Sequence, residues 1–326
     1  MNDRRSDQFG EMMKGMSYRP GYISLHRSGE LRKRGEALWE MLKRCRLCPR
    51  ECGVNRIAGE KGVCSATAKL KVASFHAHYG EERPLVGEGG SGTIFMSHCN
   101  LGCIFCQNWE ISHRGLGTEV EIEELAGMML GLQEQGCQNI NIVTPTHYAP
   151  HVLLALDRAA EQGLHLPLVY NTCGWERTEI LALLDGVVDI YLPDLKYMDA
   201  GKAALYSNDA KSYPEVTRQA LIEMNRQVGV AIPAENGMIY RGLMIRHLVM
   251  PGGASGSAEA MQWIAEHLPR STYVNIMIQY SPTYHANHHP EIDSFVTREA
   301  FRQVVDRARN LGLNNLSVDL RRIVDL

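Results

Sequence analysis

The residues best suited to chemistry in this chain are three cysteines on one short stretch, spaced Cys99-x3-Cys103-x2-Cys106. We call residues 97–109 the cysteine loop. Three thiolates at this spacing can hold three irons of a cubane [4Fe–4S] cluster and leave the fourth iron open to a substrate or cofactor. Gly102 allows the loop to turn tightly, and its backbone N–H can donate to a cluster sulfur.

A zinc knuckle and three reduced core thiols are the alternative interpretations of the cysteine loop. A structural zinc site usually takes four protein ligands, in pairs spaced by two to four residues. The cysteine loop offers three ligands and no obvious fourth nearby. The ligand count therefore favours an iron–sulfur cluster with an open site.

A second group of cysteines has the spacing Cys45-x2-Cys48-x3-Cys52-x11-Cys64, and we call residues 45–64 the four-cysteine segment. Four thiolates close a tetrahedral site, which suits structural Zn²⁺ or an auxiliary [4Fe–4S] cluster. The ferredoxin run of three two-residue gaps followed by Cys-Pro is absent. We favour a structural metal here, with zinc ahead of a cluster and unliganded thiols as the remaining alternative.

The composition indicates a soluble globular chain with a sizeable core. Of its 326 residues, 44% are hydrophobic and 22% charged, enough for one large α/β domain or two ordinary ones. A net charge of −3 argues against a surface that coats nucleic acid. Without a long apolar run or a signal-like N-terminus, we expect no membrane span and a cytoplasmic location. Nine cysteines in that compartment indicate metal or redox chemistry rather than disulfides.

From about residue 70 onward, short apolar runs alternate with helical patterns. The predicted strands are residues 71–77, 93–96, 139–143, 167–171, 189–192, 243–250 and 274–280. The predicted helices are residues 30–43, 122–135, 151–162, 176–184, 215–228, 257–267 and 298–311, with residues 1–28 irregular and Ser255 or Ser257 as a possible helix cap. This alternation predicts parallel strands with helical crossovers, which fits a full or partial TIM-like barrel or an open doubly wound sheet.

Polar or unusual residues follow almost every predicted barrel strand. They are the cysteine loop and residues 144–148, 171–174, 193–196, 251–253 and 280–282. In barrels the chemistry gathers at the carboxyl ends of the strands. We therefore expect one active-site mouth, and we place Asn171 among its cofactor-binding candidates.

Three charged residues at strand positions are candidate ligand contacts. Asp194 and Lys196 are two apart, so both can point the same way. A carboxylate suits a ribose diol and a lysine suits a carboxylate, although a solvated salt bridge is an equally good interpretation. Arg246 and His247 are adjacent in an apolar strand, so only one can face inward. An inward Arg246 would be a buried cation that needs a partner, and His247 would then pack outward.

Other reactive side chains give weaker signals. Thr144 and Thr146 offer hydroxyls and carbonyls for an ammonium group, or simply form an ordinary strand-to-helix loop. We interpret Cys137 and Cys173 as structural thiols. The histidines of residues 285–289 are a weak candidate for metal binding.

These motifs together resemble the activating-enzyme branch of radical S-adenosylmethionine (SAM) proteins. More closely, the chain resembles homologues of the pyruvate formate-lyase activating enzyme that carry an N-terminal cysteine knuckle. The resemblance covers roughly residues 45–285. It is carried by residues 45–53, the cysteine loop with its continuation to residue 112, residues 194–196 and residues 249–252.

The resemblance implies a partial (β/α)6 TIM-like barrel over residues 71–326, with a C-terminal helix. Residues 1–70 then form an N-terminal helix and a metal-binding extension. SAM would bind at the barrel mouth to the open iron of a cluster held by Cys99, Cys103 and Cys106, with Phe105 against the adenine. Asp194 and Lys196 match the positions that hold the SAM ribose and carboxylate. The Gly-Gly-Glu-Pro motif of the family is replaced by residues 144–146, where Thr144 and Thr146 could contact the SAM amino group.

The function implied is an oxidoreductase that cleaves SAM reductively and yields a 5′-deoxyadenosyl radical. The radical would abstract hydrogen from a protein or small-molecule substrate, and activation of a glycyl-radical enzyme is one candidate. A flavodoxin- or ferredoxin-type protein would supply the electron, and no nucleic acid or membrane partner is expected. The alternative is a non-catalytic iron–sulfur or zinc protein for electron transfer or interaction.

Overall fold

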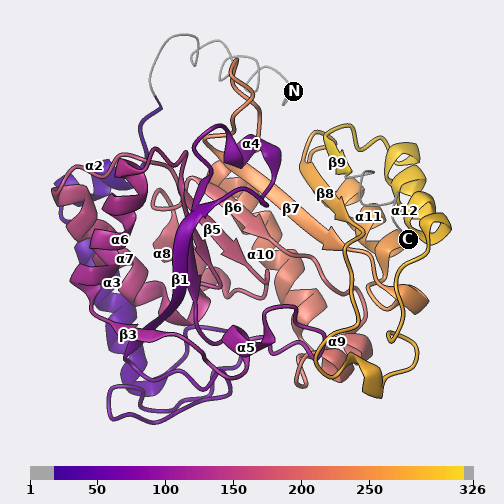
Figure 1. The fold of residues 1–326 in the computed structure, drawn as a ribbon, viewed down its shortest axis with the longest axis horizontal. Coiled ribbons are helices and arrows are strands. Elements are labelled where there is room, and N and C mark those ends of the chain that lie inside the picture. The colour runs from indigo at the N-terminus through magenta and orange to yellow at the C-terminus, as the bar shows by residue number, and fades with distance from the viewer. Residues whose placement is uncertain (1–17, 319–326) are drawn as a thin grey trace.

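The computed structural model describes residues 18–318 and is built around one mixed nine-stranded sheet (Figure 1). The strand order is β3-β1-β2-β4-β5-β6-β7-β8-β9. The strands are β1 (Leu70–His78), β2 (Ser91–Met96), β3 (Thr118–Val120), β4 (Ile140–Val143), β5 (Leu168–Thr172), β6 (Ile190–Pro193), β7 (Gly242–Leu248), β8 (Tyr273–Met277) and β9 (Leu316–Val318).

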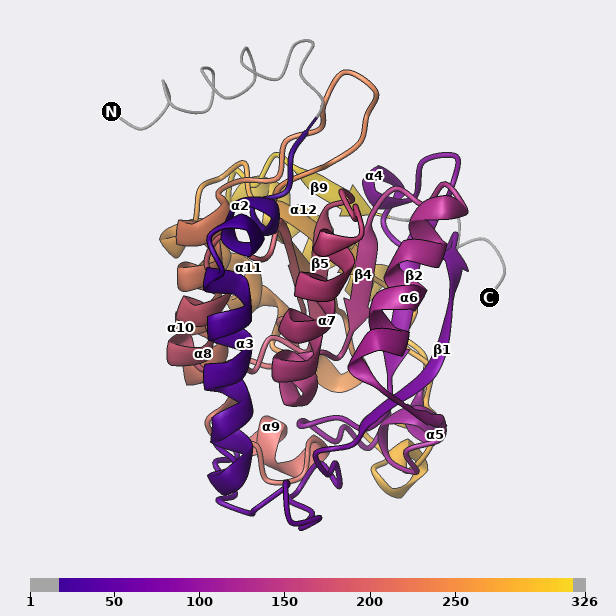
Figure 2. The ribbon, with the colours of Figure 1, turned by 90° about the vertical axis from the view of Figure 1, so that its left-hand side faces the viewer.

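Helices cover the outer face of this sheet (Figures 1 and 2). The α-helices are α2 (Tyr22–Arg27), α3 (Glu30–Glu40), α4 (Arg83–Val86), α5 (Trp109–Ser112), α6 (Ile122–Glu134), α7 (Ala149–Glu161), α8 (Thr178–Leu184), α9 (Ala200–Tyr206), α10 (Tyr213–Val228), α11 (Ser257–His267) and α12 (Arg298–Asn310). The short 3₁₀ helices are η1 (Met41–Arg44), η2 (Thr146–Tyr148), η3 (Pro251–Gly253) and η4 (Ala286–His288).

Strands β2 and β4 to β9 run parallel to one another, and helical segments connect them as the alternating pattern predicts. The sheet curves but is not closed, because β3 and β9 are its two edges. A partial TIM-like barrel is therefore confirmed, and this curvature brings the carboxyl ends of β2 and β4 to β8 around one mouth.

The direction of the first strand differs from the prediction. β1 pairs antiparallel with both β2 and β3. Its connection to β2 contains only the four-residue helix α4. That segment is too short to carry a full crossover helix across the sheet, so the chain returns as a broad hairpin.

The other element predictions hold with small shifts, except at a few short segments. Residues 22–27, predicted to be irregular, form α2, while residues 1–17 lie outside the described residues. The short elements α4, α5, α9, β3 and β9 were not predicted. Gly256, not a serine side chain, occupies the N-cap of α11, in the left-handed conformation.

The N-terminal helices pack onto the barrel, and Figure 2 shows α3 beside α7. Gly35 makes this approach possible, since a Cβ there would lie 2.9 Å from the Leu154 side chain. All nine cysteines are free thiols. Within residues 18–318, no helix has both the length and the apolar character needed to cross a membrane.

Candidate functional site

A cavity of about 260 Å³ lies at the carboxyl ends of the parallel strands. Strands β2 and β4 to β8 each contribute lining residues, which lie at or just beyond the end of the strand. The lining includes Cys99, Cys103, Phe105 and Cys106 after β2, Thr144 after β4, Asn171, Thr172 and Cys173 at β5, Asp194 and Lys196 after β6, Arg246 and Leu248 in β7, and Met277 and Gln279 at β8. The structure thus brings together nine of the ten residues that the sequence predicts as cluster or cofactor ligands at the mouth: Cys99, Cys103, Cys106, Phe105, Thr144, Asn171, Asp194, Lys196 and Arg246. Thr146 lies apart from them.

The three thiols of the cysteine loop face this cavity together. The Leu101 N–H donates to Cys99 Sγ at 3.4 Å. Hydroxyls reach the other two sulfurs, from Ser207 to Cys103 Sγ at 3.1 Å and from Ser112 to Cys106 Sγ at 3.2 Å. Donors on all three sulfurs favour the thiolate forms that metal binding needs.

Burial opposes ionisation of these thiols, because it raises the pKa of each one. A hydrogen bond from Cys173 lowers the pKa of Cys99 to about 6, although burial opposes it. Burial raises the pKa of Cys103 to about 12 and also raises that of Cys106. Cys103 and Cys106 therefore need a further positive group beside them before all three thiols can ionise.

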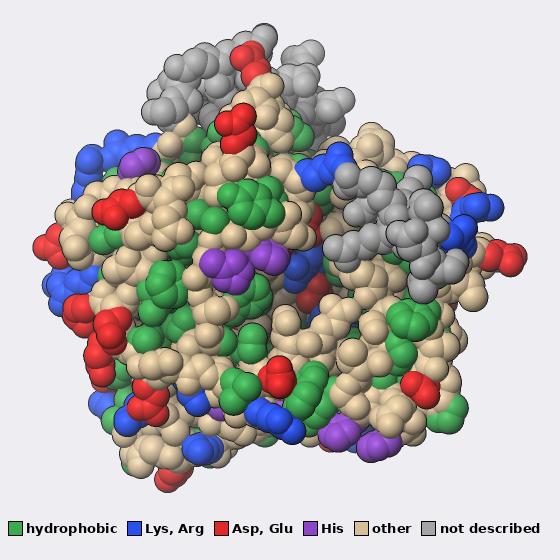
Figure 3. All heavy atoms as spheres, in the orientation of Figure 1, with side chains coloured by type: hydrophobic (Ala, Val, Ile, Leu, Met, Phe, Trp, Pro, Cys, Tyr) green, Lys and Arg blue, Asp and Glu red, His purple; other side chains and the backbone are tan. Residues whose placement is uncertain are grey.

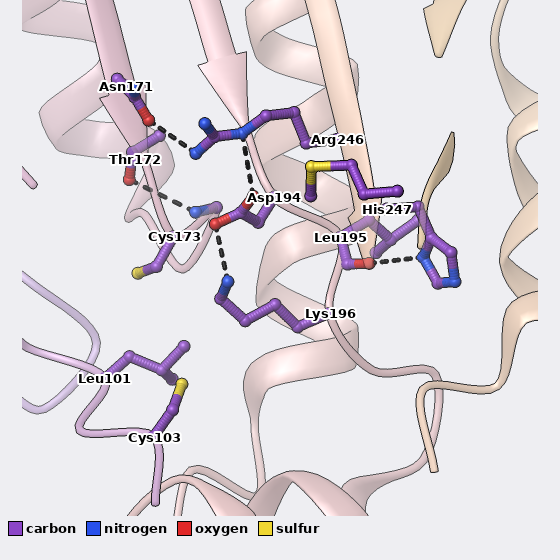
Figure 4. Close-up of polar contacts among 12 residues, drawn as sticks. Leu101, Cys103, Asn171, Thr172, Cys173, Asp194, Leu195, Lys196, Arg246 and His247 are labelled. Carbon is purple, nitrogen blue, oxygen red and sulfur yellow. Dashed lines mark hydrogen bonds and ion pairs between the residues drawn. The ribbon is translucent and has the colours of Figure 1, made fainter. Parts of the chain in front are cut away.

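Asp194 is the centre of a buried charge network (Figure 4). Its Oδ1 accepts from Arg246 Nε at 3.0 Å, and its Oδ2 accepts from Lys196 Nζ at 2.7 Å. Burial would raise the pKa of Asp194, but these two cations outweigh it and lower the pKa. Figure 4 shows Lys196 on the side of Asp194 that faces Cys103.

The strands themselves hold this network in place. Asp194 pairs with Arg246 as an isolated parallel bridge, and the Leu195 N–H donates to the Arg246 carbonyl at 2.8 Å. Of the two adjacent residues, Arg246 is the one that faces inward, and its Nη2 donates to Asn171 Oδ1 at 2.6 Å. His247 faces the other way and contacts Leu195 and Ser257 beneath α11, which confirms its packing role.

The two threonines after β4 have different surroundings. Thr144 lines the cavity and has a φ of 60°, a conformation that is rare for a β-branched residue and typical of functional sites. Thr146 is fully buried and is not part of the cavity lining. Its hydroxyl donates to Glu176 Oε1 at 2.5 Å, and burial raises the pKa of Glu176 to about 7.

Sequence reasoning missed some residues of this site. Cys173 was interpreted as structural, yet it lines the cavity beside Cys99, and its thiol donates to Asn100 Oδ1 at 3.6 Å. Gln279 and Met277 at the end of β8 were not singled out. Residues 171–174 were already placed at the predicted mouth, so the position of Cys173 was available from the sequence. Met277 and Gln279 were hidden because the predicted strand runs to residue 280, whereas β8 ends at Met277.

The four-cysteine segment lies against the cysteine loop. Arg50 donates to the carbonyls of Asn100 and Leu101, each at 3.0 Å, and to Ser207 at 3.1 Å. Its guanidinium stacks 4.7 Å from the Trp175 ring centre. The segment therefore braces the backbone that carries the first two cysteines of the loop.

The four thiols of this segment also influence one another. Burial raises the pKa of Cys48 and that of Cys64, and neighbouring Cys45 adds to both shifts. Among residues 18–318, however, no three His, Cys, Asp or Glu side chains converge closely enough to hold a metal ion. This holds for the histidines of residues 285–289 too, so metal binding by either group stays a prediction.

Comparisons with known proteins bear on this site. Residues 93–230 match the family described as the radical SAM superfamily. The chain is 30% identical over 284 residues to the uncharacterized protein MJ0674 of Methanocaldococcus jannaschii, covering 84% of this chain and 77% of that protein. The chain carries a radical SAM domain over residues 93–230.

Two solved structures are similar to this radical SAM chain. A radical SAM methyltransferase from Sphaerobacter thermophilus aligns with a TM-score of 0.48 and 16% identity, over 70% of this chain and 66% of that one. TYW1 with a lysine-pyruvate adduct bound aligns with a TM-score of 0.41 and 12% identity, over 71% of this chain and 75% of that one.

A radical SAM domain implies a [4Fe–4S] cluster, SAM and SAM-cleaving radical chemistry, with an external reductant. The residues of this cavity suit both groups. A cubane places each sulfur ligand at a different iron, so its thiols stand around the cluster instead of converging on one ion. The three thiols surround one cavity, and the positive irons of a cluster would allow them to ionise there. The adjacent network of Asp194, Lys196 and Arg246 provides partners for a polar cofactor.

Proposed function

We propose that this chain is an enzyme that binds a [4Fe–4S] cluster through Cys99, Cys103 and Cys106 and holds SAM against the open iron. The observation that carries the proposal is the shared cavity, in which the three thiols face Asp194 and Lys196. The cluster requires thiolate ligands, and SAM requires polar side chains that bind and orient it beside the cluster.

The charge network is the proposed SAM contact. Asp194 is oriented by two cations and can accept hydrogen bonds from the ribose hydroxyls. Lys196, Arg246 and the Asn171 amide are placed to bind the carboxylate. Thr144, with its strained backbone, is the proposed contact for the amino group.

Apolar side chains complete the cavity. Phe105 is 5% exposed and packs against Tyr280, so its ring is available to the adenine at a fixed angle. Leu248 and Met277 line the wall beside it. These groups exclude water from the place where a reactive carbon would form. The chemistry that the bound pair supplies is a 5′-deoxyadenosyl radical, which abstracts hydrogen from a substrate after a flavodoxin- or ferredoxin-type protein delivers one electron.

The test is anaerobic reconstitution with iron and sulfide, followed by dithionite and SAM. We expect four irons per cysteine loop and formation of 5′-deoxyadenosine. Cys103→Ala should abolish both, whereas Cys137→Ala, a buried cysteine outside the cavity, should retain them. A chain with an intact cluster that releases no 5′-deoxyadenosine would instead support the rival function, a non-catalytic electron carrier or interaction protein.

We also propose a structural metal in the four-cysteine segment, with zinc ahead of an auxiliary cluster. Backbone hydrogen bonds that fold the segment around its cysteines support it: the Gly53 N–H donates to the Cys45 carbonyl and the Glu51 N–H to the Cys48 carbonyl, each at 3.0 Å. Elemental analysis of the purified protein should find zinc that is lost in Cys48→Ser and kept in Cys103→Ala. Extra iron in place of zinc would indicate the auxiliary cluster. No metal lost on Cys48→Ser would refute a metal at this segment.

The substrate is a protein or a small molecule, and a glycyl-radical protein is one candidate of the first kind. A protein substrate needs a docking surface around the mouth, whereas a small molecule needs a cavity that encloses it. Hydrogen abstraction from a glycyl-radical loop would be seen as a protein-based radical by electron paramagnetic resonance.

A further inference from the structure

A second cavity, of about 610 Å³, adjoins the first. It lies between the segment after β1 and the strands β8 and β9, and Figure 3 shows a hollow in this face with acidic and basic side chains in its depth. Arg246, Met277 and Gln279 line both cavities. A molecule in the second cavity would therefore have direct access to the first.

Glu82 lines this second cavity and has one buried carboxylate oxygen without a partner. Its Oε1 accepts from Asn275 Nδ2 at 2.8 Å, while its Oε2 is buried and has no hydrogen-bond partner. The residue is only 7% exposed. A buried carboxylate oxygen without a donor is costly, so the cavity favours an occupant that donates a hydrogen bond there.

Glu81 makes the same place more acidic. Its side chain is 9% exposed, and its nearest cation is Arg246, whose Nη1 lies 3.8 Å from Glu81 Oε2. Burial raises the pKa of Glu81 to about 7 against the opposing effect of Arg246, and Glu82 raises it further. Arg246 is already committed to Asp194, so it cannot neutralise both glutamates.

The charges around the two cavities do not balance. Asp194, Glu81 and Glu82 are three carboxylates, and Lys196 and Arg246 are the two buried cations among them. Arg83 also lines the second cavity, but it is exposed at the rim. The buried groups are thus short of one positive charge when all three carboxylates are ionised.

We propose that the second cavity binds the substrate by a cationic amine or guanidine, held by Glu82 and Glu81. This inference rests on the proposed function, because it names the substrate class of that site. An ammonium or guanidinium donates to carboxylates more strongly than a neutral group does. With the cation held there, the rest of the substrate extends past Met277 and Gln279 toward the first cavity.

The test uses isothermal titration calorimetry on the reconstituted holoprotein with SAM. The probes are n-hexylamine, n-hexylguanidine, 1-hexanol and hexanoate, which share a chain and differ in the head group. The two cations should bind at least tenfold more tightly than hexanol, and hexanoate should be weakest. Equal binding of hexanol and hexylamine would overturn the proposal, because a glutamate pair that shares a proton would not discriminate between them.

Variants test the same contact. Glu82→Gln should weaken hexylamine binding roughly ten- to hundredfold, since it removes one charge without changing shape. Glu88→Gln, an exposed glutamate on the same connection between β1 and β2, should bind hexylamine as the native chain does. Unchanged affinity in Glu82→Gln would refute the assignment. Thermal unfolding checks that the variant folds, and the probe series on the native chain needs no variant.

A lysine-containing peptide distinguishes the two sources of the cation, a protein side chain and a free amine. An acetylated Gly-Lys-Gly amide that binds more tightly than hexylamine indicates a protein side chain, and weaker binding indicates a free amine; either result supports a cationic group. Failure of the two proposals is distinguishable. Native protein that releases 5′-deoxyadenosine but does not prefer cations refutes this inference alone, while cation binding without 5′-deoxyadenosine refutes the proposed function alone.

Discussion

At the scale of single residues, the site depends on charges that are paired before any cofactor binds. Lys196 and Arg246 are both mostly buried, and both rely on Asp194. Burial would lower the pKa of Lys196, but Asp194 and the Cys103 sulfur raise it. A buried network of this kind is rigid only while every member has its partner.

Asp194→Asn should disable SAM binding without unfolding the chain. The change leaves Lys196 and Arg246 as two like charges in one buried place, with no carboxylate between them. We expect SAM affinity to fall at least about tenfold, measured by calorimetry on the reconstituted protein. Asp306→Asn, on the exposed face of α12, is the control and should bind SAM normally. Normal affinity in Asp194→Asn would remove this residue from the proposed contacts.

Arg50→Lys should loosen the cysteine loop from a distance. Lysine keeps the charge, but one ammonium cannot replace the guanidinium fork that reaches the Asn100, Leu101 and Ser207 carbonyls. We expect the free energy of unfolding to fall by about 1–3 kcal/mol. Iron bound per chain after reconstitution should also fall, whereas Arg46→Lys, an exposed neighbour, should change neither. Full iron loading in Arg50→Lys would show that the loop does not depend on this contact.

At the scale of elements, the site is made by strand ends that lie side by side. The Thr144 N–H donates to the Asn171 carbonyl at 2.8 Å, and the Asp194 N–H donates to the Thr172 carbonyl at 3.0 Å. Each strand thereby positions the residue just beyond the end of its neighbour. Gly174 allows the closest of these approaches, since it has a φ of 81° and faces the Asp194 carbonyl.

Gly174→Ala should damage both stability and SAM binding. A Cβ there would overlap the Asp194 carbonyl and lie 3.1 Å from the Thr217 side chain. Gly163→Ala is a matched control, because its φ is 96° and no atom lies within 4 Å of the added Cβ. In urea unfolding the control should lose about 1–2 kcal/mol for the left-handed backbone alone. Gly174→Ala should lose about 1–3 kcal/mol more of the free energy of unfolding, because its Cβ also overlaps a neighbour. Equal losses in the two variants would show that the strand ends move apart without cost.

At the scale of the whole molecule, buried neutral histidines join the barrel to its N-terminal segment. His151 contacts the Ala68 carbonyl at 2.7 Å and packs against Trp39 of α3. His147 contacts the Ser97 carbonyl, and the buried Arg56 donates to the His147 carbonyl. Burial lowers the pKa of His151 to about 4 and that of His147 to about 3.

These histidines predict acid lability. The folded pKa of His151 is about 4 and the ordinary value is 6.5, so its contribution is complete above pH 6.5 and is lost as the pH falls toward 4. In that window only the unfolded chain takes up the proton, at about 1.4 kcal/mol per pH unit for one group. His151→Gln should make the urea-derived free energy of unfolding less steep between pH 6.5 and 4. The control is His165→Gln, exposed on a loop, which should keep the slope of the native chain. A native slope in His151→Gln as well would contradict the prediction.

Local patterns in the sequence were enough to predict most of the barrel and much of its mouth. Spacing within a few residues predicts the cysteine loop and the pair Asp194 and Lys196. The two-residue period of a strand predicts that Arg246 and His247 face opposite sides. Alternation of short apolar runs with helical patterns predicts the parallel strands and therefore the end at which these residues meet.

Only the tertiary structure decided which of these side chains touch, because those contacts join residues far apart in the chain. The antiparallel direction of β1, the place of Cys173 beside Cys99 and the withdrawal of Thr146 to Glu176 all depend on neighbours that no local pattern names. The contact between Glu82 and Asn275 spans 193 positions. Periodicity predicts which face of the sheet a residue occupies. The partner that lies opposite a buried charge is determined by the folded sheet, and that partner decides what the charge can do.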